Sequence, residues 1–230
     1  MKIAIVGAME EEVEILRREI GLGKITTIGN CEFIEGKVGK HQVIVTKSGI
    51  GKVNAAMATT ILLQNYKPDV VLNTGSAGGT NPELEVGTIV ISDYVLHHDV
   101  DVTAFGYELG QVPQLPASFP SDSTLIGFAR EAVIELDTYE HCVGTIASAD
   151  TFMDDPEKVL QVKSRFPRVI AVEMEAAAVA QVCYQFNTRC VVIRALSDIA
   201  GKESTVSFEE FLPLAAKHSS QIVLRVISKL

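Results

Sequence analysis

Three acidic residues that lie far apart in the sequence, Glu12, Glu175 and Asp198, stand where a carboxyl group could do chemistry. Glu12 follows Met9 by three residues and precedes Leu16 by four, so it borders the apolar face of a predicted helix. Glu175 begins an apolar stripe at helical spacing, and Asp198 ends an apolar strand. A carboxylate in such a place loses its hydration unless it has a partner or a function. The three are therefore candidate functional groups, and general acid–base catalysis is the usual work of such carboxyls.

Each of these acids also has a structural interpretation. An acid in the first turn of a helix stabilises the helix dipole, which is the preferred explanation for Glu10 and Glu11 and an alternative one for Glu175. Asp198 could equally be a helix N-cap or a turn residue. The residues alone leave both interpretations open.

Arg194 interrupts the apolar run Cys190–Leu196. A buried guanidinium group needs an anionic partner, which Glu12 or Glu175 could supply. Whether Arg194 contacts a ligand or only pairs with a carboxylate is not decided by its position in the sequence.

Four predicted strands end in small or acidic residues, at 7–12, 74–79, 172–175 and 196–198. If the sheet is parallel, these ends lie on one rim, where small residues let a ligand approach the backbone closely. The loop expected at Gly75–Gly79 lacks the Gly-Lys-Ser/Thr ending of a P-loop, and no G-x-G-x-x-G follows the first strand. Six apolar residues are, taken singly, more typical of a core than of a pocket wall: Met9, Ile50, Phe152, Met153, Met174 and Phe208.

The elements that must position these residues alternate between strand and helix. Strands are predicted at 2–7, 69–74, 86–95, 141–149, 169–173 and 190–196, with hairpin strands within 25–47. Helices are predicted at 9–20, 51–66, 121–136, 155–166 and 175–186, and a closing helix from about 207. This order predicts an α/β fold in one domain over 1–230, with a mixed, mostly parallel central sheet flanked by helices.

The stretch 97–120 differs from the rest, because it carries aromatic, glycine and proline residues without periodicity. A loop of this length inside a compact domain is usually functional or covers something.

Composition narrows the function classes. The 230 residues are 47% hydrophobic and carry a net charge of −9, from 29 acidic and 20 basic residues, which disfavours nucleic acid as a partner. The four cysteines show no metal-ligand spacing, so neither a metal site nor a disulfide framework is expected. The apolar start of the chain is too short for a signal peptide and no apolar run reaches membrane-spanning length, so we expect a cytoplasmic protein with no membrane partner.

Six segments together carry a resemblance: GAMEEEV at 7–13, KSGIGKVNAA at 47–56, NTGSAGG at 73–79, HDVDVTAFGYELGQVP at 98–113, VEMEAAAVA at 172–180 and RALSDIA at 194–200. The chain resembles the purine nucleoside phosphorylase superfamily, and within it the nucleosidases of 5′-methylthioadenosine and S-adenosylhomocysteine. The segments span nearly the whole chain in the order and spacing of that family. The resemblance implies a nucleoside phosphorylase-like fold and hydrolysis that releases adenine and a 5-thioribose product, in methionine salvage and S-adenosylmethionine by-product recycling.

The resemblance also implies a role for each acid. Glu12 would hold and deprotonate the attacking water, and Asp198 would protonate or hydrogen-bond N7 of the departing adenine. Glu175 would hold the ribose hydroxyls. Breaking this bond builds positive charge on the sugar and negative charge on the base, which suits two carboxyl groups with separated pKa values. The chemistry calls for no metal and no organic cofactor.

Further residues follow from the same resemblance. Met174 would pack against the sugar, Phe152 would stack on the base, and the backbone of Met153 would read the edge of the base. The remaining substrate-binding residues would be Met9, Ile50, Ser76, Ala77, Gly78, Glu173, Arg194, Ser197 and Phe208.

The segment 98–113 would cross into a neighbouring subunit, where Val102, Phe105 and Pro113 would line the partner's alkylthio pocket. This explains the apolar and aromatic residues of the long loop and predicts a homodimer.

Other functions remain to be weighed. A phosphorylase of the same fold would need basic groups for phosphate, but the first loop offers Glu10, Glu11 and Glu12 instead. A hydrolase could act on futalosine or 5′-deoxyadenosine, because the groups that contact the base tolerate related substrates. A nucleoside-binding protein without catalysis would be expected to lack Glu12 or Asp198, and both are present.

Overall fold

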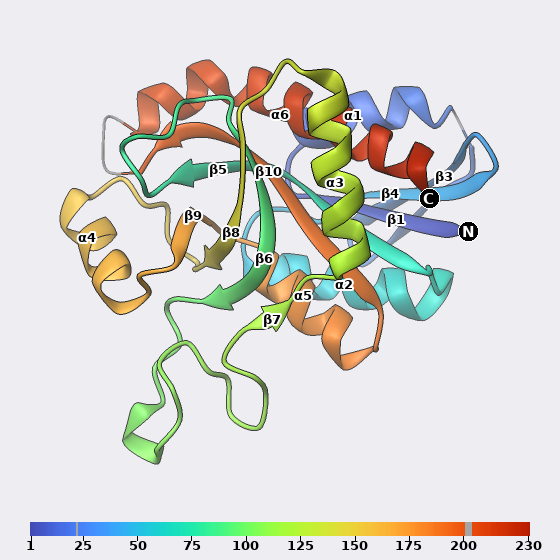
Figure 1. Ribbon diagram of the computed structural model, residues 1–230. Coiled ribbons are helices and arrows are strands. Elements are labelled where there is room, and N and C mark those ends of the chain that lie inside the picture. Colours follow the sequence, from blue (N-terminus) through green and yellow to red (C-terminus); the bar gives the residue numbers. More distant parts are fainter. Residues whose placement is uncertain (22, 201–203) are drawn as a thin grey trace.

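The computed structural model describes residues 1–21, 23–200 and 204–230 (Figure 1). Its helices are α1 (Glu10–Glu19), α2 (Lys52–Tyr66), α3 (Ser123–Leu136), α4 (Pro156–Arg165), α5 (Ala176–Gln185) and α6 (Ser204–Lys229), with a 3₁₀ turn η1 (Thr103–Phe105). Its strands are β1 (Lys2–Gly7), β2 (Ile25–Ile28), β3 (Cys31–Val38), β4 (His41–Lys47), β5 (Val70–Gly79), β6 (Ile89–His97), β7 (Phe119–Pro120), β8 (His141–Ser148), β9 (Val169–Glu173) and β10 (Arg189–Ile199).

The strands form one mixed sheet, which confirms the predicted α/β class. Its order is β10-β6-β8-β9-β5-β1-β4-β3-β2, and β10 also pairs with β5. Because of this extra pairing, the described strands β5, β10, β6, β8 and β9 close into a ring, from which β1, β4, β3 and β2 extend. The sequence did not reveal this closure.

The direction of β9 corrects one expectation. Strands β1, β5 and β10 run parallel, but β9 pairs with β5 in the antiparallel sense, with Gly78 opposite Val172. The end of β9 therefore reaches the carboxyl ends of β5 and β10 from the opposite direction, and the four predicted strand ends do not share one parallel rim. They still meet, because β9 crosses β5 at the last residues of both strands.

The glycine-rich segment Gly75–Gly79 is a second correction, since it continues strand β5 instead of forming a loop. Strand β10 likewise extends past Leu196 to Ile199, so Ser197 and Asp198 lie within it. Both extensions arise because the two strands pair with each other in parallel as far as Gly79 and Ile199. The apolar residues of one strand do not indicate which other strand pairs with it, so the sequence did not predict these extensions.

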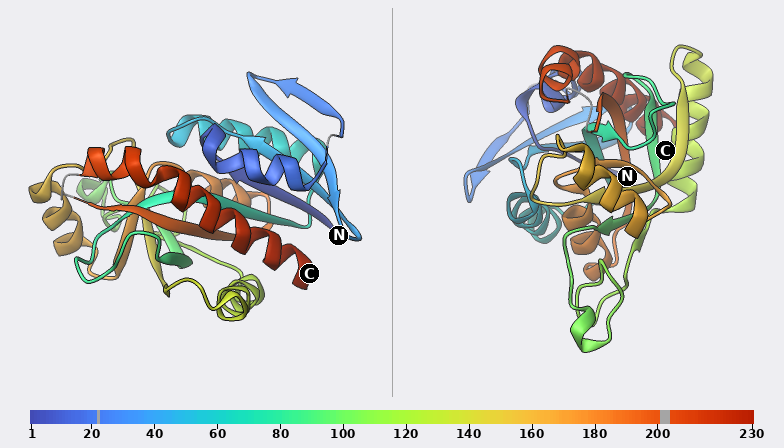
Figure 2. Two further views of the ribbon diagram at one scale, coloured as in Figure 1. Left: turned by 90° about the horizontal axis from the view of Figure 1, so that it is seen from above. Right: turned by 90° about the vertical axis from the view of Figure 1, so that its left-hand side faces the viewer.

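Helices cover both faces of the sheet (Figures 1 and 2). In β1, Ile3 and Ile5 face the core under α1, α3 and α6, whereas Ala4 and Val6 face the core under α2 and α5. This alternation follows from the two-residue period of a strand, and burial on both faces explains why β1 reads as a continuous apolar run.

The two chain ends lie near each other, and the loop that carries η1 projects away from the body (Figures 1 and 2). Among the helices that the structure describes, none combines the length and the hydrophobicity of a transmembrane segment.

Candidate active site

A cavity of about 300 Å³ opens where the ends of β5, β9 and β10 meet the turn between β1 and α1. Most residues predicted from the sequence line this cavity: Met9, Glu12, Ile50, Ser76, Ala77, Gly78, Phe152, Met153, Glu173, Met174, Glu175, Ser197, Asp198 and Phe208. The structure thus brings together segments separated by up to nearly 200 positions. The apolar residues that singly are typical of a core, such as Ile50 and Phe208, contribute to the cavity wall here.

Four lining residues were not predicted: Ala8, Thr151, Val172 and Ala200. Ala8, Thr151 and Val172 are direct sequence neighbours of predicted residues, and Ala200 follows Asp198 by two positions. Their place in the wall follows from the path of the backbone.

Glu12 is held by the start of its own helix and by β5. Its Oε2 accepts hydrogen bonds from the backbone N–H groups of Ala8 (2.8 Å) and Met9 (3.1 Å). Its Oε1 accepts from the backbone N–H (3.0 Å) and the hydroxyl (3.1 Å) of Ser76. With 1% of its surface exposed, the carboxylate is fixed in orientation at the cavity wall. Glu10, by contrast, lies in the first turn of α1 and forms surface ion pairs with Arg17 and Lys47.

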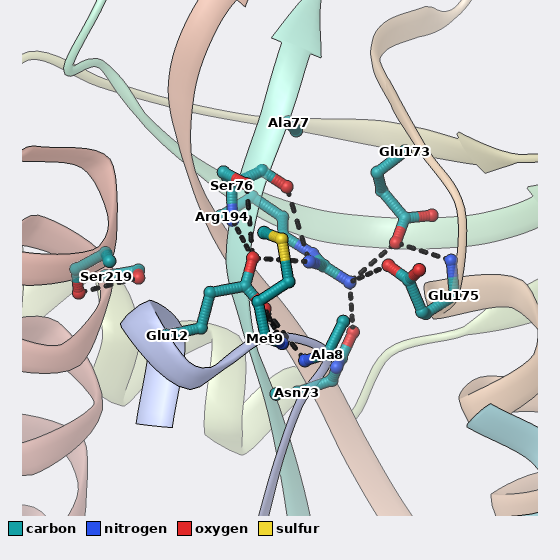
Figure 3. Close-up of polar contacts among 12 residues, drawn as sticks. Ala8, Met9, Glu12, Asn73, Ser76, Ala77, Glu173, Glu175, Arg194 and Ser219 are labelled. Carbon is teal, nitrogen blue, oxygen red and sulfur yellow. Dashed lines mark hydrogen bonds and ion pairs between the residues drawn. The ribbon is translucent and has the colours of Figure 1, made fainter. Parts of the chain in front are cut away.

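Arg194 lies among three carboxylates (Figure 3). Its Nη2 donates to Glu173 Oε2 (2.5 Å) and lies 3.7 Å from Glu175 Oε2, and its Nη1 lies 4.0 Å from Glu12 Oε1. Burial opposes its charge, but the three carboxylates outweigh that effect and raise the pKa of Arg194. Arg194 is not among the cavity-lining residues, so the geometry favours pairing over ligand contact.

Glu173, which the sequence did not identify as the main partner of Arg194, also organises the start of α5. Its Oε2 accepts from the backbone N–H groups of Glu175 (2.9 Å) and Ala176 (2.8 Å), and its Oε1 accepts from the Ser148 hydroxyl. A signal was available, because acidic side chains near a helix start can accept from its unpaired first N–H groups, and Glu173 lies three positions before α5.

The surroundings of Glu175 strongly perturb the proton affinity of its carboxyl group. Burial first, and then the negative charge of Glu173, raise the pKa of its carboxyl from 4.5 to about 8. The guanidinium of Arg194 and the N–H of Gly51, which donates to Glu175 Oε1 at 2.8 Å, act in the opposite direction. Burial and the neighbouring carboxylates together outweigh the guanidinium and the Gly51 N–H, which favours the protonated form of Glu175 near neutral pH.

Asp198 also lines the cavity and lies opposite Gly78, near the glycine-rich end of β5. Its Oδ1 accepts from the hydroxyl of Ser197 (2.9 Å), and 2% of its surface is exposed. A Cβ on Gly78 would lie 3.0 Å from Asp198 Oδ2, so the small residue at 78 makes room for this carboxyl group.

The outer part of the cavity is aromatic. The rings of Phe152 and Phe208 meet edge to face with centroids 5.6 Å apart, and both side chains stay partly exposed. This arrangement offers an apolar surface to a flat ligand.

Val102, Phe105 and Pro113 do not line this cavity. They lie on the projecting loop, where Phe105 is 82% exposed. Among the described residues, no group of three or more His, Cys, Asp or Glu side chains is placed to hold a metal ion.

Comparison with known proteins gives a consistent picture. Residues 2–228 match the family model of the Phosphorylase superfamily. A 5′-methylthioadenosine/S-adenosylhomocysteine nucleosidase from Lysinibacillus sphaericus is 60% identical over 230 residues, the whole length of both chains.

Two solved structures extend the comparison. The nucleosidase of the same name from Neisseria meningitidis, in complex with methylthio-immucillin-A, is 45% identical with a TM-score of 0.98, covering 100% of this chain and 99% of that chain. The futalosine hydrolase of Helicobacter pylori is 32% identical with a TM-score of 0.95, covering 100% of this chain and 98% of that chain.

Proposed function

This chain belongs to the Phosphorylase superfamily, and we propose on that basis that it is a nucleosidase. It hydrolyses the bond between adenine and ribose in 5′-methylthioadenosine and S-adenosylhomocysteine, and it releases adenine and the 5-thioribose product. The observation that carries this function is the meeting of three buried carboxyl groups, Glu12, Glu175 and Asp198, around one cavity of nucleoside size.

The reaction divides its work between two of these acids. As the bond breaks, positive charge grows on the sugar and negative charge moves into the purine. We assign Glu12 to the water, which it orients and deprotonates, and Asp198 to N7 of the purine, where it donates a proton or a hydrogen bond. Each proton-transfer role is typically worth about 10²- to 10⁴-fold in rate. The fixed orientation of Glu12 by Ala8, Met9 and Ser76 supports its assignment.

We assign Glu175 to the ribose hydroxyls, with Met174 against the sugar. When these hydroxyls donate to Glu175, they favour its ionised form, so substrate binding lowers the pKa that burial and Glu173 raise. The pair Phe152 and Phe208 supports a place for the base at the aromatic side, with the backbone of Met153 at its edge.

Hydrolysis is favoured over phosphorolysis by the charge of the cavity. Among the residues that the structure describes, its wall contains Glu12, Glu173, Glu175 and Asp198 but no Lys, Arg or His. Arg194, the nearest guanidinium, is already engaged by carboxylates. A phosphate dianion therefore finds repulsion here in place of a cationic partner.

The decisive assay compares adenine release with and without inorganic phosphate. We expect the same rate in both, with free 5-methylthioribose as the second product. A rate that depends on phosphate, with a ribose 1-phosphate product, would overturn the assignment in favour of a phosphorylase.

Futalosine is a second candidate substrate, because the structure resembles the futalosine hydrolase of Helicobacter pylori over the whole chain. Competition assays with futalosine and 5′-deoxyadenosine against 5′-methylthioadenosine measure this activity directly. Inhibition without turnover would restrict the enzyme to the thionucleosides.

At the level of the whole protein, we propose one nucleosidase domain over 1–230 that acts in the cytoplasm as a homodimer. In this dimer, the loop 98–113 of one subunit completes the site of the other through Val102, Phe105 and Pro113. The high exposure of Phe105 at the projecting loop supports this arrangement.

A further inference from the structure

Lys52, at the first position of α2, connects three segments that approach the cavity from different sides. Its Nζ donates to Asp99 Oδ1 at 2.6 Å, and its backbone N–H donates to Asp150 Oδ1 at 2.7 Å. The backbone N–H of Asp150 in turn donates to Asp99 Oδ2 at 3.2 Å. We call these three residues the Lys52 bridge. Only 18% of the Lys52 side chain is exposed, although its charged end reaches the surface.

One end of the bridge leads to Glu175. Gly51 directly precedes Lys52, and its N–H donates to Glu175 Oε1 at 2.8 Å. The φ angle of Gly51 is +94°, which favours glycine, and a Cβ there would lie 3.1 Å from Asp150 Oδ1. The position of this N–H therefore depends on how tightly α2 is held against Asp150.

The other end leads to the segment that follows β8. Asp150 directly precedes Thr151, Phe152 and Met153, which line the cavity. Asp99 follows the end of β6, next to β8, and begins the projecting loop 98–113. The bridge thus fixes α2, the aromatic side of the cavity and the root of the loop relative to one another.

The ion pair contributes to this arrangement through its charge. Burial of Asp99 opposes ionisation, but the ammonium of Lys52 and the N–H of Asp150 outweigh it and lower the pKa of Asp99. Asp99 is therefore ionised at neutral pH and holds Lys52 through a charge-assisted hydrogen bond.

From this geometry we propose that Lys52 is a positioning residue for the ribose end of the site: through the bridge it holds the Gly51 N–H against Glu175. This inference rests on the proposed function, in which Glu175 holds the ribose hydroxyls. Lys52 itself is not among the cavity-lining residues, so it acts through its neighbours and not by touching the substrate.

The test compares substrates with and without ribose hydroxyls in the Lys52→Met variant, which keeps the aliphatic stem and removes the charge. For 5′-methylthioadenosine we expect KM to rise about tenfold, the effect of weakening one hydrogen bond to a charged group, with kcat changed much less. For the 2′,3′-dideoxy analogue, whose sugar offers Glu175 no hydroxyl, we expect the inhibition or dissociation constant to change less than about twofold.

Two further variants separate positioning from general stability. Lys52→Arg keeps the charge and is expected to restore most of the affinity. Lys229→Met removes a lysine of similar burial, which pairs with Glu131 and Glu135 away from the cavity, and is expected to leave KM unchanged. Thermal unfolding of each variant reports whether the fold is intact.

An equal loss for both ligands in Lys52→Met, or no loss for either, would overturn the proposal. An equal rise of KM in Lys229→Met would do the same, because it would indicate a general effect of lost stability. The proposed function is tested separately by adenine release from the wild-type protein, whereas the bridge is tested by ratios between variants, so the two can fail independently.

Discussion

Asp198 is the single side chain on which proton donation to the purine depends in the proposed mechanism. Replacement by Asn keeps the size of the group and its contact with Ser197, but removes the acid. We expect Asp198→Asn to lower adenine release by about 10²- to 10⁴-fold while the fold and the dimer survive. Single-turnover adenine release measures the loss of activity. Circular dichroism and gel filtration measure whether the fold and the dimer survive.

Asp137→Asn is the matched control, because Asp137 ends α3 outside the cavity and asparagine tolerates its φ of +45°. Near-normal activity in Asp198→Asn would contradict its role as the acid.

The raised pKa of Glu175 makes the free energy of unfolding decrease as the pH rises. Its carboxyl has a pKa of about 8 in the folded protein and 4.5 as its ordinary value, so the native state holds a proton that the unfolded chain has lost between these values. The resulting stabilisation is complete below about pH 4.5 and disappears as pH rises through about 8. We expect Glu175→Gln, which cannot ionise, to lose stability less steeply over this range than the wild type.

Urea denaturation at several pH values between 5 and 9, without ligand, provides the measurement. The two proteins share all other titrating groups, so the difference between their curves reports the ionisation of Glu175 together with its coupling to Glu173 and Arg194. Parallel curves would mean that the carboxyl ionises normally in the fold.

Among the elements, strand β5 passes close to Arg194 and Glu12 at Gly75. This residue has φ of +147°, and a Cβ there would lie 2.4 Å from Arg194 Nη1 and 2.5 Å from Glu12 Oε1. A side chain would therefore both strain the backbone and push the ion cluster apart. We expect Gly75→Ala to destabilise the protein by about 2–4 kcal/mol and to reduce activity.

The Gly39→Ala variant separates the cost of backbone strain from the cost of crowding. Gly39 also has a positive φ, +56°, but no atom lies within 4 Å of its hypothetical Cβ. Its substitution should cost only about 1 kcal/mol of backbone strain in urea denaturation. Equal losses for the two variants would show that crowding at Gly75 is unimportant.

For the whole molecule, the proposed dimer builds each active site from residues of both subunits. Two inactive variants with defects in different parts of the site should therefore complement each other. Phe105→Ala alters the loop that one subunit contributes to its partner's site, and Asp198→Asn alters the cavity within the same subunit. In a mixed dimer, the site of the Phe105→Ala subunit has its own Asp198 and receives the intact loop of the Asp198→Asn subunit. One of the two sites in the dimer is therefore complete. Random mixing should restore activity to about a quarter of the sites, because half of the dimers are then mixed.

Co-expression and purification of the mixture, followed by adenine release at low substrate concentration, measures this recovery. If the mixture is no more active than the separate variants, each site is built from one chain alone, and the loop has another role.

The sequence by itself predicted most of the elements and most of the residues that line the cavity. Helical periodicity predicted α1 and α5, an uninterrupted apolar run predicted β1, and the alternation of strands and helices predicted the α/β class. The positions of Glu12 and Glu175 at the edges of apolar stripes marked both as carboxyls with unusual surroundings, and both line the cavity. Their catalytic roles stay predictions until the variants are measured.

Only the tertiary structure decided how these parts meet. The antiparallel approach of β9, the closure of the ring through β5 and β10, and the choice of Glu173 as the main partner of Arg194 all depend on contacts between distant segments. The raised pKa of Glu175 has the same origin, since burial and the charge of Glu173 act on it through space. The spacing of apolar residues indicates which face of a helix or strand is buried, but it does not indicate which element packs on that face. The pKa of a buried group depends on the residues packed around it, so the sequence does not predict its value.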